Sequence, residues 1–167
     1  ALTKIIEHQI KNGTDYLVVC GTTAETPTLT GEEKEEIKRC VAQTAAGRIP
    51  LVYGIGGNNT REVVRQVTTT DLTGYDAILS VTPYYNKPSQ EGLYQHYSAI
   101  AKASSLPIIL YNVPGRTGVN MTAETTLRIA NEFKNVCAVK EASGNFSQID
   151  DIIKNKPADF MVISGDD

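Results

Sequence analysis

The sequence predicts an α/β protein built on a parallel sheet, and three features support this fold class. Six short, nearly continuous apolar runs have the character of strands that are covered on both faces. Segments with helical spacing of apolar residues separate these runs, which recur every 24 to 34 residues. The unusual polar residues nearly all follow the carboxyl end of a run. Alternating strands and helices imply either a doubly wound open sheet or a (β/α)8 barrel.

The predicted strands are residues 16–20, 50–56, 77–81, 107–111, 136–140 and 160–163. A barrel requires eight strands and typically about 250 residues. If the fold is a TIM (β/α)8 barrel, we therefore expect residues 1–167 to form part of the catalytic domain, with about six βα units. The first strand and the last units would be missing. No Gly-x-Gly-x-x-Gly follows the first run, which weakens the dinucleotide-binding alternative.

Local signals define the predicted helices. Thr30 and Glu33 form a capping-box sequence, and Gly47 ends the helix that follows. Asn59 or Thr60 is expected to cap the next helix. The predicted helices are residues 2–11, 30–46, from 59 or 60 through 67, 90–103, 122–133 and 148–154.

Composition excludes several functional classes. The net charge of −3 and the pI near 5.4 argue against binding to nucleic acid or to an anionic membrane, because such binding favours a positively charged surface. No apolar run approaches the roughly 20 residues of a membrane span. Three widely spaced cysteines suggest a reduced, cytoplasmic protein. Two histidines without ligand spacing argue against a zinc site, so no metal is expected.

Lys140 is the chemically distinctive residue of the fifth predicted strand. Strand alternation places Val136, Ala138 and Lys140 on one face. Removal of an amine from water favours its neutral form, which can attack a carbonyl carbon and form a Schiff base. The alternative is a structural lysine that pairs with Glu141 or extends to solvent.

The polar residues at strand ends point to one active-site mouth, because that end of a parallel sheet carries the active site in α/β folds. Alternation places Val18, Cys20 and Thr22 on one face of the first strand, so Thr22 is expected to face the same mouth as Tyr111 and Lys140. The complete set is Thr22, Thr23, Asn58, Tyr84, Tyr85, Tyr111, Arg116, Lys140 and Asp166.

Each of these residues also has a structural interpretation. Thr22 could cap a turn, and the tyrosines could be core rings with solvated hydroxyls. Arg116 could be a solvated loop cation, or a guanidinium that binds a carboxylate. The glycines between 54 and 57 could cradle a phosphate, but we interpret them as tight turns.

Four motifs in collinear order resemble the dihydrodipicolinate synthase family of pyruvate-dependent class I aldolases. The resemblance covers essentially the whole chain. The motifs are Gly21-Thr22-Thr23-Ala24-Glu25, Val81-Thr82-Pro83-Tyr84-Tyr85-Asn86-Lys87-Pro88, Tyr111-Asn112-Val113-Pro114-Gly115-Arg116-Thr117-Gly118 and Val139-Lys140-Glu141-Ala142.

The resemblance implies a (β/α)8 barrel followed by a small helical C-terminal region that would be missing from this chain. It also implies that the enzyme condenses pyruvate with L-aspartate 4-semialdehyde on the diaminopimelate route to lysine. It implies that Lys140 forms the Schiff base and that Tyr111 relays protons. Thr22 would connect Tyr111 to Tyr85, and Tyr85 would serve the site of a neighbouring subunit in a homodimer or homotetramer. No cofactor would be needed, because the imine formed on the lysine is the electron sink.

The same resemblance assigns substrate contacts. Arg116 would bind the carboxylate of the semialdehyde at the mouth. Thr23 and Gly165 would contact the pyruvate carboxylate or the bound intermediate.

The sequence departs from the family pattern in two places. Ala24 stands where a glycine is usual, and alanine would be strained if that backbone had a positive φ. Asn58, Glu62 and Tyr84 match a site at which some members bind inhibitory lysine. The histidines of inhibited members are replaced by Gly31 and Lys34, which argues against feedback inhibition.

Two further hypotheses stay open at this point. One is a related aldolase such as N-acetylneuraminate lyase, although the Arg116-Thr117-Gly118 sequence favours the synthases. The other is a catalytically inactive barrel with a binding role, which the intact Lys140 and Tyr111 argue against.

Overall fold

A computed structural model describes residues 1–165, which divide into two compact units. The first unit comprises Ala1–Gly54 and Asp71–Leu79, and the second comprises Ile55–Thr70 and the residues from Ser80 onward. Asp166, one of the polar residues expected at a strand end, lies outside the described residues.

Six strands form where the apolar runs predict them, and their order in the sheet follows their order in the chain. A doubly wound sheet reverses its strand order at a switch point, so the unreversed order favours the barrel alternative. The paired neighbours for which the register is defined are all parallel. The strands are β1 (Leu17–Val19), β2 (Leu51–Gly54), β3 (Ala77–Val81), β4 (Ile108–Asn112), β5 (Val136–Glu141) and β6 (Met161–Ser164).

The helix starts predicted at Thr30 and at Asn59 or Thr60 are confirmed, with Asn59 as the second capping residue. The Thr30 hydroxyl accepts a hydrogen bond from the Glu33 amide, and the Glu33 carboxylate accepts one from the Thr30 amide. Asn145 caps α7, which begins at Phe146, two residues before the predicted start at Gln148. The α-helices are α1 (Leu2–Lys11), α2 (Gly31–Ala45), α3 (Thr60–Thr69), α4 (Gln90–Ala103), α5 (Pro114–Thr117), α6 (Ala123–Glu132) and α7 (Phe146–Asn155). No helix in residues 1–165 is long and apolar enough to cross a membrane.

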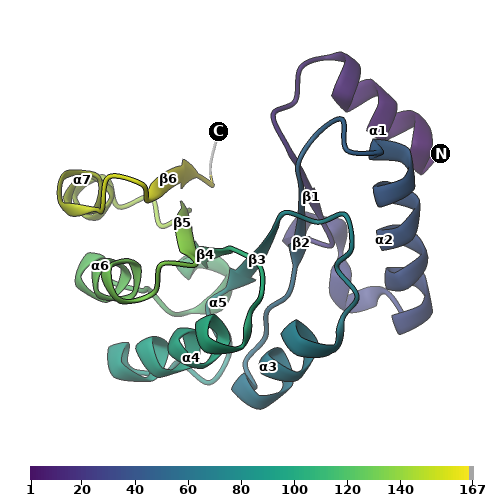
Figure 1. Cartoon of the computed structure of the whole chain (residues 1–167). Helices are drawn as coiled ribbons and strands as arrows, with labels where there is room; N and C mark the ends of the chain where they lie inside the picture. The colour runs from purple at the N-terminus through teal and green to yellow at the C-terminus, as the bar shows by residue number, and fades with distance from the viewer. Residues whose placement is uncertain (166–167) are drawn as a thin grey trace. The chain divides into compact units, whose positions relative to one another are not determined.

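In the first unit, α1 lies beside α2, and α2 packs against β1 (Figure 1). Leu17 pairs with Leu51, and Val19 pairs with Tyr53. Ala45 and Leu51 are almost completely buried, so the core of this unit lies between the helices and the strands. Its apolar burial supplies the main stabilising contribution.

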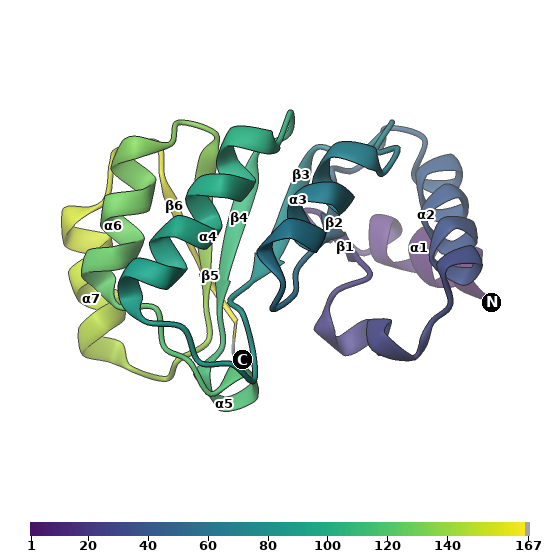
Figure 2. The ribbon, with the colours of Figure 1, turned by 90° about the horizontal axis from the view of Figure 1, so that it is seen from below.

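In the second unit, α4, α6 and α7 form a row beside β4, β5 and β6 (Figures 1 and 2). The side chains that fill the space between helices and strands are aliphatic and almost completely buried. They include Leu93, Ile100, Ile108, Leu110, Ile129 and Val139. This layer holds the carboxyl ends of β4 and β5 side by side.

The first strand is shorter than predicted, and this overturns the alternation argument for Thr22. β1 ends at Val19, and Cys20 adopts a left-handed conformation with φ +56°. Thr22 then begins a 3₁₀ turn, Thr22–Ala24. Because alternation holds only along an extended strand, it does not determine the direction of Thr22. Ala24 is not among the residues with positive φ, so the expected strain at this alanine does not arise.

A bulge interrupts the pairing of β4 with β5. Ile108 pairs with Val136, but Ile109 pairs with Ala138, so Cys137 is the additional residue on β5. From there the register continues without interruption to Tyr111 opposite Lys140.

Gly54 and Gly56 allow close approach of two backbones and do not form left-handed turns. A Cβ atom on Gly54 would lie 2.2 Å from the carbonyl oxygen of Cys20, and one on Gly56 would lie 2.9 Å from the amide nitrogen of Val81. Neither glycine has a positive φ. The prediction of tight turns here was therefore wrong, and steric exclusion of a side chain explains both residues.

His96 is a buried histidine in α4. Its Nδ1 lies 2.8 Å from the Thr60 hydroxyl, which joins α4 to the first residue of α3. Its Nε2 is buried and has no hydrogen-bond partner among the described residues. Burial disfavours the imidazolium and lowers the pKa of His96 to about 4.

We predict that Gly54→Ala lowers the free energy of unfolding by about 1–3 kcal/mol, because the new methyl group overlaps a backbone oxygen. Urea unfolding measures this loss. Gly31→Ala is the control, since no atom lies within 4 Å of the added Cβ at that position. Equal stability of the Gly54→Ala variant and the unmodified protein would contradict the close approach.

The low pKa of His96 predicts acid sensitivity. Between pH 6.5 and pH 4 the unfolded chain binds a proton at this residue and the folded chain does not, so stability falls as the pH falls. Between pH 7 and pH 5 the expected loss is about 2 kcal/mol in the free energy of unfolding. Urea unfolding at several pH values should show a shallower slope for His96→Asn. The control, exposed His8→Asn, should keep the original slope.

Candidate active site

Tyr111 and Lys140 occupy directly opposite positions at the carboxyl ends of β4 and β5. The Lys140 Nζ lies 4.5 Å from the centroid of the Tyr111 ring, a cation–π arrangement. Tyr111 is buried, whereas Lys140 is only partly buried. The predicted meeting of these two residues is therefore present.

The structural interpretation of Lys140 required an ion pair with Glu141. No such pair forms between these two residues. Its carboxylate is 2% exposed and receives hydrogen bonds from Asn112, Ser143 and Gln148. The Lys140 amine remains close to a phenol ring at a partly open strand end. A carbonyl compound that reached this end could form an imine with the amine.

Arg116 lies on α5, directly after β4. Its side chain is exposed, and the turn beneath it is fixed by Thr117, whose hydroxyl donates to the carbonyl oxygens of Val113 and Val119. Gly118 ends the turn with φ +71°. This arrangement presents a guanidinium near the end of the strand that carries Tyr111.

Gly165 follows β6, and packing alone accounts for a glycine there. Its amide donates to the Glu141 carbonyl oxygen at 2.8 Å. A Cβ atom would lie 2.5 Å from the Cβ of Ala142. The predicted substrate contact at Gly165 stays a prediction.

Tyr84 and Tyr85 lie on an exposed loop after β3 and are not core rings. Tyr85 is 89% exposed and has φ +73°, and Tyr84 is 43% exposed. The Tyr85 amide donates to the carbonyl oxygen of Thr117, so the loop is attached to the α5 turn.

The three residues that match a lysine-binding site are Asn58, Glu62 and Tyr84. The carbonyl oxygen of Asn58 accepts from the Asn86 side chain at 3.2 Å, which places it near the tyrosine loop. Hydrogen bonds from Arg65 and Gln66 lower the pKa of Glu62 to about 2. Glu62 is therefore occupied by partners on its own helix, α3.

Thr22 and Thr23 belong to the first unit, where both are exposed in the 3₁₀ turn after β1. The other predicted catalytic and substrate-binding residues belong to the second unit. Tyr111, Lys140 and the α5 turn with Arg116 are thus assembled within one unit, and the roles of Thr22 and Thr23 stay predictions.

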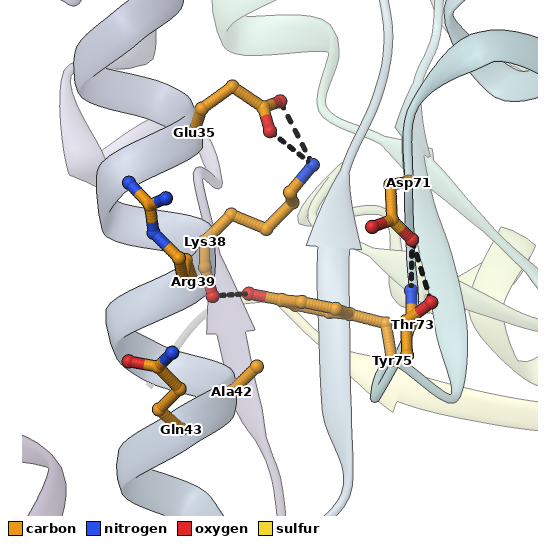
Figure 3. Close-up of a pocket in the computed structure, with 8 residues that line it drawn as sticks. All are labelled: Glu35, Lys38, Arg39, Ala42, Gln43, Asp71, Thr73 and Tyr75. Carbon is orange, nitrogen blue, oxygen red and sulfur yellow. Dashed lines mark hydrogen bonds and ion pairs between the residues drawn. The ribbon is translucent and has the colours of Figure 1, made fainter.

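A cavity of about 470 Å³ in the first unit contains none of the predicted site residues (Figure 3). In it, the Tyr75 hydroxyl donates to the carbonyl oxygen of Lys38, and the Lys38 amine pairs with Glu35. The lining residues therefore already satisfy part of one another's hydrogen-bonding capacity. No cluster of metal-ligating side chains is present in residues 1–165.

Asn112 and Glu141 were not predicted as functional residues. The sequence contains a signal that could have identified them, since Tyr-Asn and Lys-Glu pairs end two neighbouring strands. One member of each pair faces the candidate site, and the other is buried against the helices.

Comparison with known proteins identifies the family. The model of the Dihydrodipicolinate synthetase family matches residues 1–167. The chain belongs to this family. Its predicted fold class, the (β/α)8 barrel with about six βα units in this chain, is confirmed by the strand order and by the structural relatives.

Two family members named 4-hydroxy-tetrahydrodipicolinate synthase are highly similar over the whole chain. The protein from Parabacteroides distasonis is 71% identical, and that from Phocaeicola vulgatus is 65% identical. The chain spans 56% of the length of each. A solved dihydrodipicolinate synthase from Acinetobacter baumannii, described as complexed with pyruvate, is 45% identical and superposes with a TM-score of 0.93. That alignment covers 99% of this chain and 56% of the solved one.

Proposed function

We propose that the protein acts as a 4-hydroxy-tetrahydrodipicolinate synthase, a carbon–oxygen lyase that condenses pyruvate with L-aspartate 4-semialdehyde. The observation that carries the proposal is the Lys140 amine 4.5 Å from the Tyr111 ring centroid at adjacent strand ends. Membership of the family supports it, as does the pyruvate named for the Acinetobacter baumannii relative.

In the proposed reaction, the neutral Lys140 amine attacks the keto carbon of pyruvate, and water leaves as the imine forms. Loss of a proton from the methyl group converts the imine to an enamine. The enamine carbon then attacks the aldehyde carbon of the semialdehyde, and a carbon–carbon bond forms. The protonated imine accepts the electron pair during deprotonation, so this route needs no cofactor.

Proton transfer and substrate binding are assigned to the remaining residues. Tyr111 relays protons near the imine, and Thr22 and Tyr85 continue the relay. Arg116 binds the carboxylate of the semialdehyde, because a planar guanidinium suits a carboxylate. Thr23 and Gly165 contact the carboxylate of pyruvate or the bound intermediate.

We also propose that the protein is a cytoplasmic homodimer or homotetramer. The large exposure of Tyr85 supports this, since a ring on an outward loop can reach the site of a second subunit. Asn58, Glu62 and Tyr84 stay the candidate lysine-binding set, but Gly31 and Lys34 at the histidine positions of inhibited members argue against feedback inhibition.

The proposal predicts that borohydride traps pyruvate on Lys140. The full-length protein is incubated with pyruvate and reductant, and peptide mapping is expected to show Lys140 heavier by one pyruvic acid less one oxygen atom. Lys140→Arg should lose both the adduct and at least roughly a thousandfold in turnover, because it lacks a nucleophilic amine.

Lys134→Arg is the matched control, since Lys134 is an exposed lysine just before β5. It should keep both adduct formation and turnover. Normal turnover by Lys140→Arg, or an adduct on another lysine only, would contradict the assignment.

A further inference from the structure

Asn112 and Glu141 form a buried pair behind the candidate catalytic residues. They occupy opposite positions in the β4–β5 register, one residue beyond Tyr111 and Lys140. Successive side chains of a strand point to opposite faces, so this pair lies on the face away from Tyr111 and Lys140. Asn112 is 0% exposed and Glu141 is 2% exposed.

The Glu141 carboxylate is held by N–H donors. The Asn112 side-chain amide lies 3.0 and 3.2 Å from its two oxygens. The Ser143 amide lies 3.0 Å from Oε1, and the Gln148 side-chain amide lies 3.2 Å from Oε2. Within residues 1–165, no ion pair joins Glu141 to a lysine or arginine. These amide donors must therefore satisfy an acceptor-only group.

The same network reaches the segment that follows Arg116. The Asn112 side-chain amide donates to Asn120 Oδ1 at 2.8 Å, and Asn112 Oδ1 accepts from the Met121 amide at 2.9 Å. Asn120 in turn donates to Gln148 Oε1 at 2.8 Å. One cluster thus connects the ends of β4 and β5, the start of α7 and the chain just beyond the α5 turn.

We propose that Glu141, acting through Asn112, is a positioning residue for the Lys140 amine. The inference rests on the proposed function. A buried polar network that is fully satisfied is rigid, and a partly satisfied one is not. Fixing Asn112 against Glu141 therefore fixes the backbone of their neighbours, Tyr111 and Lys140, on the other face. Imine formation depends on this geometry, because small displacements of reacting groups greatly reduce rates.

Glu141→Gln tests the proposal with little change in shape. One acceptor oxygen becomes an N–H donor that faces the donors of Asn112, Ser143 or Gln148. In the full-length protein, the initial rate of borohydride trapping at saturating pyruvate should fall about 10- to 100-fold. The rate is expressed per folded molecule, with the folded fraction measured by circular dichroism and urea unfolding.

Two further variants separate positioning from general stability. Asn112→Asp combined with Glu141→Gln restores one carboxylate opposite one amide, but it removes the donor to Asn120 Oδ1 and one of the two acceptors for Ser143 and Gln148. It should therefore recover only part of the trapping rate. Asn135→Ala removes a side-chain hydrogen bond to Ala101 at the other end of β5. It should lower the urea midpoint and leave the trapping rate per folded molecule unchanged.

The outcomes distinguish this proposal from the proposed function. If the unmodified protein gives an adduct on Lys140 and Glu141→Gln traps pyruvate at the same rate per folded molecule, the positioning role is overturned and the function stands. A rate in Asn135→Ala that falls as far as in Glu141→Gln also overturns it, since general loosening then explains both. Absence of an adduct in the unmodified protein overturns the function, and the positioning role with it.

Discussion

The hydrogen bond between the Asn112 amide and the Glu141 carboxylate is the constraint on which the candidate site depends. A buried carboxylate that forms no ion pair is costly to remove from water, so its donors must be placed accurately. Meeting that requirement brings β4, β5 and the start of α7 to one point. The Lys140 amine and the Tyr111 ring then meet on the opposite face as a consequence of backbone geometry.

Chemical reactivity and structural order are thus divided between the two faces of one strand pair. The face that carries Tyr111 also carries the Lys140 amine, which can react with a carbonyl group. The opposite face carries Glu141, which is buried and whose carboxylate accepts hydrogen bonds from amide groups. Because neighbouring residues on a strand share a rigid backbone, order on one face limits movement on the other without direct contact between the side chains.

Local signals in the sequence predicted much of the fold. The capping box at Thr30 and the side-chain cap at Asn59 mark helix starts correctly, because both depend on residues within one turn. The Tyr111–Lys140 meeting was also accessible, since both residues end apolar runs. The direction of Thr22 was not, because the left-handed Cys20 breaks the alternation on which that argument rested.

Contacts between segments that are distant in the chain could not be predicted from local sequence signals. No local sequence signal shows that Gly54 faces the carbonyl oxygen of Cys20. Sequence patterns alone therefore favour tight turns at the glycines between 54 and 57. In the same way, sequence proximity suggests an ion pair between Glu141 and Lys140. The hydrogen-bond donors to Glu141 come instead from β4, the Ser143 backbone and α7. Tertiary packing selected among options that the sequence left equivalent.

The bulge at Cys137 has a consequence for the tolerance of the site to a change in chain length. It separates the Ile108–Val136 pair from the pairs that follow it, so the register at Lys140 does not depend on the number of residues before Ala138. Loss of the single codon for Cys137 would leave a regular ladder in which Lys140 still lies opposite Tyr111.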